Sequence, residues 1–107
     1  MKLRVDYVFS TAPSRIEGLQ GKSIGDFACA VFVYEDERRP RFHMGTVPYE
    51  LFLSSVVGGV CAESYRMEPG SGDVYQISGP TCCVIESRKR IPVGSSVDLV
   101  DGWLVVS

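Results

Sequence analysis

Four cysteines and one histidine are the side chains of this chain that could form a thiol nucleophile with an imidazole base, or a set of soft metal ligands. A thiol nucleophile needs a base within hydrogen-bond reach, and His43 is the single histidine that could serve Cys82 or Cys83. Alternation along its strand directs His43 away from Phe42 and Met44, which predicts an exposed surface histidine. A cysteine-dependent enzyme is the third of three functional hypotheses. Because the histidine that it needs is predicted to lie on the surface, the sequence favours a protein without enzymatic activity.

The spacing of the cysteines argues against a shared metal ion and against a disulfide framework. Cys82 and Cys83 are adjacent, and adjacent residues of a strand point to opposite faces, which separates their sulfur atoms. Cys29 and Cys61 add none of the paired spacings that zinc sites use. We therefore expect reduced thiols, no metal and no cofactor.

Residues 18–23 end like a phosphate-binding loop, because they read Gly-Leu-Gln-Gly-Lys-Ser. Such a loop needs a glycine separated by four residues from its Gly-Lys-Ser end, and Ile16 occupies that position. A chain of this length also lacks the alternating parallel units that accompany the loop. A solvated loop is the favoured interpretation.

Two basic clusters lie in or beside predicted turns. The first contains Arg38, Arg39 and Arg41, and the second contains Arg88, Lys89 and Arg90. If both turns lie at the same end of the sheet, the clusters form a positive patch that could bind phosphates or an acidic protein surface. The acidic residues 35–37 can neutralise the first cluster, and an ordinary charged surface is the favoured interpretation. With the loop 10–23, these turns motivate a second functional hypothesis, a module that binds a small anionic ligand or a phosphate.

The only tryptophan lies in a predicted hairpin at the end of the chain. Asp-Gly at positions 101 and 102 separates two apolar runs, and this dipeptide is the strongest short hairpin signal because both turn positions favour positive φ. The resulting register places Val97, Leu99, Leu104 and Val106 on a fully apolar face, which we expect in the core. Trp103, Val100 and Val105 share the mixed face. An exposed patch there would mark a partner surface, whereas a covering helix would bury the indole.

The element that must position these groups is the uncharged run from Ile24 to Tyr34. Its β-branched and aromatic residues predict a strand covered on both faces, at the centre of a sheet, with an apolar helical segment as the alternative. Alternation over residues 2–9 predicts a half-buried strand. Residues 10–23 contain few apolar side chains and are predicted to form a loop.

The period changes after Thr46, where apolar residues recur mostly at spacings of three and four. Thr46 can cap a helix, Pro48 suits a first turn, and Glu50 lies near the positive end of the helix dipole. This pattern predicts the principal helix, from about Val47 to Val57. Further strands are predicted over residues 41–46, 74–78, 81–87 and 91–93, the first as the antiparallel hairpin partner of the central strand.

Length and composition fit one globular domain, with 107 residues of which 45% are hydrophobic and 22% are charged. The expected fold class is α+β, a mainly antiparallel sheet of about five to seven strands with one principal helix. A small all-β barrel or sandwich is the alternative.

The net charge of −2 offers no general attraction for nucleic acid or anionic lipid. No apolar stretch approaches the roughly 20 residues of a membrane span, and charges interrupt the first residues where a signal peptide would be apolar. We therefore expect a cytoplasmic protein. The leading functional hypothesis is a non-enzymatic interaction module, such as an adaptor, inhibitor or assembly subunit. It would bind a protein partner or a second copy of itself through the Trp103 face and a nearby β edge.

Overall fold

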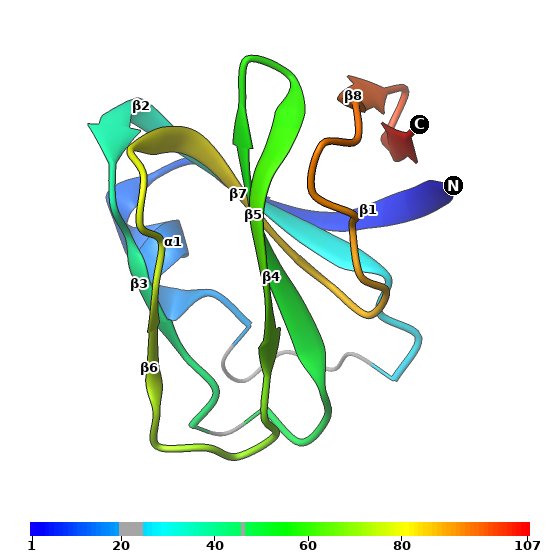
Figure 1. Ribbon diagram of the computed structural model, residues 1–107. Coiled ribbons are helices and arrows are strands. Elements are labelled where there is room, and N and C mark those ends of the chain that lie inside the picture. The colour runs from blue at the N-terminus through cyan, green and yellow to red at the C-terminus, as the bar shows by residue number, and fades with distance from the viewer. Residues whose placement is uncertain (20–24, 46) are drawn as a thin grey trace.

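The computed structural model describes residues 1–19, 25–45 and 47–107, and this part of the chain forms nine strands and one short helix (Figure 1). The strands are β1 (Lys2–Phe9), β2 (Cys29–Arg38), β3 (Arg41–His43), β4 (Leu51–Val57), β5 (Val60–Met67), β6 (Val74–Gln76), β7 (Thr81–Ser87), β8 (Val97–Val100) and β9 (Trp103–Val106), and the helix is α1 (Ala12–Glu17). Seven strands form one sheet in the order β5-β4-β7-β2-β1-β9-β8, and β3 pairs with β6 in a separate two-stranded sheet.

The large sheet is mixed. β1 and β2 are parallel, with Val8 opposite Val31, whereas the other neighbouring strands are antiparallel. Parallel neighbours cannot be joined by a tight turn, so the chain passes through α1 between β1 and β2. The fold is mainly β with a little helix, as expected, but the expectation of a mainly antiparallel sheet missed this parallel pair.

β2 is the central strand of the large sheet, with three strands on either side. Ala30 and Phe32 face one buried cluster, and Cys29 and Val31 face another. The prediction of a central strand covered on both faces is confirmed for this stretch. The strand begins at Cys29 and continues through the charged residues to Arg38, and the predicted start, Ile24, lies outside the described residues.

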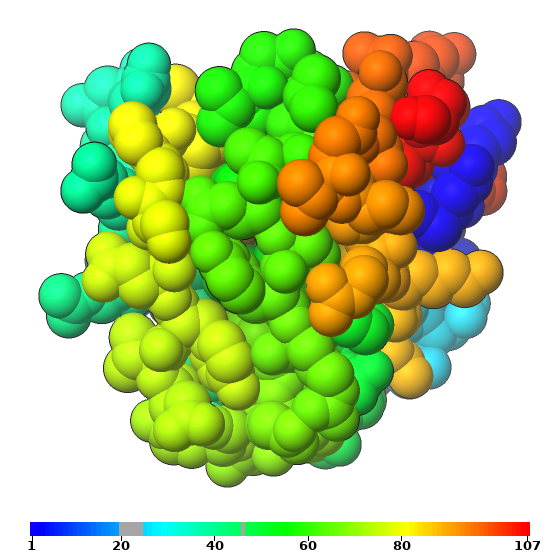
Figure 2. Space-filling model, viewed as in Figure 1, coloured from blue at the N-terminus to red at the C-terminus, as the bar shows by residue number. Residues whose placement is uncertain are grey.

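The sheet is curled, and each of its faces buries a separate core. One cluster lies between the sheet and the layer formed by β3 and β6, and the other is enclosed by β8 and β9. The two edge strands meet at one end, where the amide of Val97 donates to the carbonyl of Gly59 over 2.8 Å and Val60 bridges to Ser96. Figure 2 shows the β4–β5 hairpin in green between the yellow segment of β6 and the orange segment that precedes β8.

The predicted helix over residues 47–57 is wrong, because β4 occupies most of this range. Both faces of β4 are covered, because Leu53 belongs to the first core cluster and Val56 packs against the second. Consecutive residues such as Leu53, Ser54 and Ser55 are therefore all buried, and their burial does not alternate. Gly58 and Gly59 form the hairpin turn to β5 with φ of 59° and 74°, values that glycine adopts without strain. The predicted cap, Thr46, lies outside the described residues.

Helix α1 lies within the range that was predicted to be a loop. Thr11 caps it, because its Oγ1 accepts a hydrogen bond from the amide of Ser14 and the Ser14 hydroxyl accepts one from the amide of Thr11. Pro13 occupies the first turn, where its missing N–H has no cost. None of the helical residues is buried, so no apolar period marks the helix in the sequence. Residues 20–23 of the predicted loop lie outside the described part of the chain.

The terminal hairpin is confirmed in its register. Val100 pairs with Trp103 and Leu99 with Leu104, and the turn residues Asp101 and Gly102 have φ of 49° and 80°. The strand predicted over residues 81–87 is likewise present as β7, and the one over 2–9 as β1.

The strand predicted over residues 41–46 is present as β3, but its predicted pairing is wrong, and the strand predicted over residues 91–93 is absent. β3 pairs with β6 rather than with β2, because β1 and β7 already occupy both edges of β2. Residues 91–93 form no strand, and Ile91 instead fills the second core cluster. Among the described residues, no helix has the length and apolar character needed to cross a bilayer.

Candidate functional site

A cavity of about 330 Å³ opens between α1, the end of β2 and β3. Side chains of Leu19, Phe32, Phe42 and Val47 give it an apolar wall. Its polar lining includes Arg15, Tyr34, Arg41, His43 and Glu86. Cavities of this size, mostly apolar with a few polar groups, are typical of small-molecule sites.

Glu86 is the buried acidic group of this cavity, with 5% of its surface exposed. β7 pairs it with Ala30 of β2 and Leu53 of β4, so its side chain shares the face of the first core cluster. No hydrogen bond or ion pair joins its carboxyl to any residue that the structure describes. Burial therefore raises the pKa of Glu86 to about 8, and the carboxyl is protonated at neutral pH.

Tyr34 places a second polar group in the cavity lining. Its ring lies against the guanidinium groups of Arg15, 4.8 Å away, and Arg38, 5.5 Å away. Burial raises the pKa of Tyr34 to about 12, although both arginines oppose the shift. Its hydroxyl is therefore protonated, and it has no hydrogen-bond partner among the described residues.

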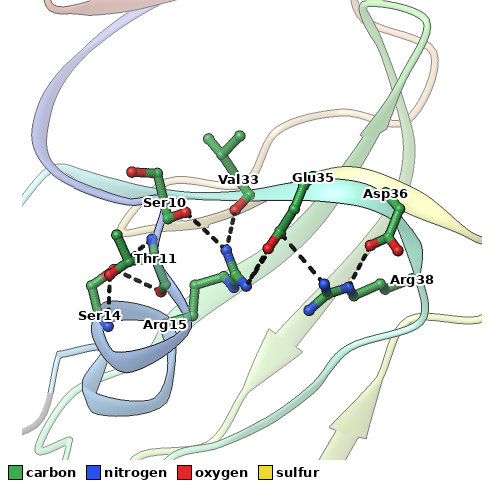
Figure 3. A network of polar contacts seen from close by, with 8 residues as sticks. All are labelled: Ser10, Thr11, Ser14, Arg15, Val33, Glu35, Asp36 and Arg38. Carbon is green, nitrogen blue, oxygen red and sulfur yellow. Dashed lines mark hydrogen bonds and ion pairs between the residues drawn. The ribbon is translucent and has the colours of Figure 1, made fainter.

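Arg15 attaches α1 to the central strand (Figure 3). Its Nη1 donates to the carbonyl of Ser10 over 3.0 Å and to the carbonyl of Val33 over 2.9 Å, and its Nη2 lies 3.3 Å from Glu35 Oε2. Only 6% of the Arg15 side chain is exposed. Because most of its donors are engaged within the protein, Arg15 mainly holds the helical wall of the cavity in place.

Arg38 is paired with the acidic residues before it, as the sequence suggested. Its Nε donates to Asp36 Oδ1 over 2.7 Å and its Nη2 lies 3.4 Å from Glu35 Oε2. A backbone hydrogen bond, aided by Arg15 and Arg38, lowers the pKa of Glu35, so this carboxylate is ionised at neutral pH. The charge of Arg38 is therefore largely compensated.

Arg41 and His43 lie on β3 at the exposed side of the cavity, on either side of the buried Phe42. Neither has a hydrogen bond or ion pair with a described residue. Phe42 points inward, where its ring meets that of Phe32 edge to face at 5.0 Å. Among the described arginines of the lining, Arg41 is the one without a carboxylate partner. The predicted exposure of His43 is confirmed.

The structure brings Arg38 and Arg41 of the first basic cluster to the cavity but does not join the two clusters. The amide of Arg88 donates to the carbonyl of Ala28 beside the start of β2, whereas Arg38 ends that strand. The second cluster instead covers aromatic rings, with Arg88 over Tyr49 at 4.2 Å and Arg90 over Phe52 at 4.9 Å. Arg39 and Lys89 lie outside the cavity lining.

The terminal hairpin exposes part of its apolar surface. Trp103 is 42% exposed and Val100 49%, whereas Val105 is half-buried, and the ammonium of Lys2 lies 5.4 Å from the Trp103 ring. On the opposite face Val97, Leu104 and Val106 are buried as expected. Leu99 is 53% exposed instead, because β8 is the edge strand of the sheet.

All four cysteines are free thiols. Burial raises the pKa of Cys29 to about 12 and that of Cys83 to about 11, so both are protonated at neutral pH. Cys82 is exposed, on the face opposite Cys83. No described hydrogen bond joins His43 to a cysteine, and no group of three His, Cys, Asp or Glu side chains in the described ranges could hold a metal ion.

Three residues at the inner end of the cavity were not among the candidates predicted from the sequence, namely Glu86, Arg15 and Tyr34. Glu86 carries a signal that could have found it, because it is the one charged residue of the strand 81–87 and alternates onto the same face as Val84. Arg15 and Tyr34 carry no comparable signal. Their proximity depends on α1 packing beside the end of β2, which no local pattern predicts.

Comparisons with known proteins identify the fold. No family model matches the chain, and no curated protein matches its sequence. A structure of a protein of unknown function from Novosphingobium aromaticivorans DSM 12444 superposes with a TM-score of 0.71 at 18% identity, covering 89% of this chain and 75% of that one. A protein proposed to be a transcription regulator, from Sinorhizobium meliloti 1021, superposes with a TM-score of 0.66 at 14% identity, covering 80% of this chain and 76% of that one. At these identities the likeness shows the fold alone.

Proposed function

We propose that the protein binds a small organic molecule in the cavity between α1, β2 and β3. The observation that carries this proposal is the carboxyl of Glu86, which is buried in the cavity lining without a partner among the described residues. The carboxyl faces the open space of the cavity, so a polar group of a ligand can hydrogen-bond to it there.

The composition of the wall supports the same function. Phe32, Phe42 and Leu19 supply apolar contact, and Tyr34 adds a hydroxyl without a described partner. Binding sites for small molecules combine an apolar wall with a few polar groups that orient the ligand. The proposal develops the second hypothesis from the sequence, because residues of the 10–23 segment and the cation of Arg41 contribute to the same cavity.

A fragment screen by thermal unfolding tests this proposal, since a molecule that binds only the folded protein raises its melting temperature. The variant Ala12→Trp places an indole at a cavity-lining position on the exposed face of α1, and Arg39→Gln alters a neighbouring cation outside the lining. We expect fragments that stabilise the wild type to lose their effect in Ala12→Trp and to keep it in Arg39→Gln. Fragments that stabilise all three proteins equally would contradict the proposal.

A second candidate function is association through the terminal hairpin, with a protein partner or another copy of the chain. It rests on the edge strand β8, whose Leu99 and Val100 are about half exposed beside Trp103. Exposed apolar residues on an unpaired sheet edge favour pairing with another chain. Light scattering and quenching of Trp103 fluorescence test it. A concentration-dependent dimer that shields the indole, and that Trp103→Lys dissociates, would support association. A monomer with a freely quenched indole would argue against association between copies.

A further inference from the structure

The inner end of the cavity offers neutral hydrogen-bonding groups. The Glu86 carboxyl is protonated at neutral pH, so it can donate one hydrogen bond and accept others, and the Tyr34 hydroxyl has the same dual capacity. Arg15 and Arg38 lie against Tyr34, so an ammonium group would meet two guanidinium groups there. These groups suit an uncharged hydroxyl of a ligand better than a cation.

The mouth of the cavity presents a charged group instead of neutral ones. Arg41 is exposed and has no carboxylate partner among the described residues, whereas Arg15 and Arg38 are engaged by Glu35 and Asp36. Glu17, the other lining carboxylate, already has an interaction of its own. Guanidinium groups bind carboxylates with two parallel hydrogen bonds, so Arg41 is the natural partner of an anionic ligand group.

Between these ends the wall is apolar and partly aromatic. Phe32 and Phe42 meet edge to face, and Leu19 and Val47 complete this side of the cavity. The volume of about 330 Å³ has room for a ring skeleton on the order of fifteen non-hydrogen atoms. A flat skeleton is favoured, because aromatic rings pack against one another at low cost.

We infer that the ligand is a hydroxylated ring carboxylate, bound with its carboxylate at Arg41 and its hydroxyl at Glu86. This inference rests on the proposed function and deepens it by assigning the chemical class and the orientation of the ligand. The same arrangement selects against amines at the inner end and against neutral molecules at the mouth. Specificity then comes from two polar contacts at different depths, with the apolar wall supplying general affinity.

Three fluorescent probes separate the two contacts. They are a hydroxynaphthoate with its hydroxyl and carboxylate at opposite ends of the ring system, the naphthoate that lacks the hydroxyl, and the hydroxynaphthamide that lacks the charge. Loss of a net hydrogen bond of about 1.4 kcal/mol corresponds to a tenfold weaker affinity. We therefore expect the wild type to bind the hydroxynaphthoate about tenfold more tightly than either of the other probes.

Variants then assign each contact to a side chain. Glu86→Leu should weaken the binding of the hydroxynaphthoate about tenfold and leave the binding of the naphthoate unchanged. Glu86→Gln can still form a hydrogen bond, so its affinity for the hydroxynaphthoate should stay within about threefold of that of the wild type. Arg41→Gln should weaken both carboxylates about tenfold and leave the hydroxynaphthamide unchanged. Arg39→Gln is the matched control and should change none of the affinities. Circular dichroism verifies that each variant is folded.

The outcomes distinguish this inference from the proposed function. If screened fragments bind in the cavity but the hydroxynaphthoate gains nothing from its hydroxyl or its carboxylate, the assigned ligand class is wrong and the cavity remains a binding site. Probe affinities that are insensitive to both Glu86→Leu and Arg41→Gln would overturn the assigned orientation. If neither the probes nor any fragment binds in the cavity, both proposals fail.

Discussion

At the scale of single residues, the Glu86 carboxyl is protonated and buried in the folded chain but ionises in water once the chain unfolds. Its pKa is about 8 in the fold against an ordinary value of 4.5. Between these values unfolding releases a proton, so the free energy of unfolding falls as the pH rises, by up to about 1.4 kcal/mol per pH unit. The pKa values of three other carboxyl groups are lowered in the fold, those of Asp6, Glu35 and Glu63. The stability that these groups contribute is lost only at pH values below the range in which Glu86 acts.

Replacing Glu86 by glutamine should remove this pH dependence, because an amide does not ionise. We expect the wild type to lose roughly 2–4 kcal/mol of unfolding free energy between about pH 5 and pH 8, and Glu86→Gln to remain nearly level. Urea unfolding at several pH values measures both curves. The exposed Glu37 offers a control, since Glu37→Gln should follow the wild type. Parallel curves for wild type and Glu86→Gln would show that this carboxyl ionises normally.

The cysteines should differ in reactivity according to their burial. Cys82 is exposed, whereas Cys29 and Cys61 are buried with raised pKa values. We expect iodoacetamide at neutral pH to modify Cys82 of the folded protein at the rate of a simple thiol, and to reach Cys29 and Cys61 only after unfolding. Peptide mass spectrometry measures each rate. A much faster reaction at Cys82 would restore the hypothesis of a cysteine-dependent enzyme.

At the level of the elements, Arg15 links α1 to the central strand. Arg15 donates to the carbonyl of Ser10 before the helix and to the carbonyl of Val33 in β2, and it lies beside Glu35 of β2. None of the apolar residues of the helix is buried. Arg15→Lys keeps the charge but loses the planar fork that reaches these acceptors together. We expect this substitution to lower the free energy of unfolding by about 1–2 kcal/mol and to accelerate amide exchange in α1.

Hydrogen exchange followed by mass spectrometry tests this role of Arg15. The β8–β9 hairpin has no contact with Arg15 in the described bonds and serves as an internal reference that should exchange as in the wild type. Arg39→Lys is the control substitution. Unchanged exchange in α1 would mean that the helix is held by other contacts.

The elements that the sequence predicts well are those with one clear signal. The sequence of β1 alternates between apolar and mostly charged residues, and Asp101-Gly102 determines the terminal register through its positive φ values. The pattern of β4 resembles that of a helix because both of its faces are covered, with Leu53 in the first core cluster and Val56 packed against the second, which removes the alternation. Its better signal was Gly58-Gly59 between two apolar runs, since paired glycines favour a hairpin turn.

At the scale of the whole molecule, the cavity joins residues that are far apart in the chain. Its lining extends from Ala12 to Glu86 and depends on the parallel pairing of β1 with β2, which places α1 beside the end of the central strand. Sequence patterns report local periodicity, and they do not give the order of strands in a sheet. One cation of the site, Arg41, was therefore predicted from the sequence, but the Glu86 carboxyl was not.

Amide NMR spectra recorded with each stabilising fragment show directly whether this cavity binds small molecules. We expect shift changes to concentrate on α1, on β2 from Phe32 to Arg38, on β3 and around Glu86, and we expect Ala12→Trp to abolish them. Shift changes that concentrate on the β8–β9 hairpin, or that persist in Ala12→Trp, would contradict binding in this cavity.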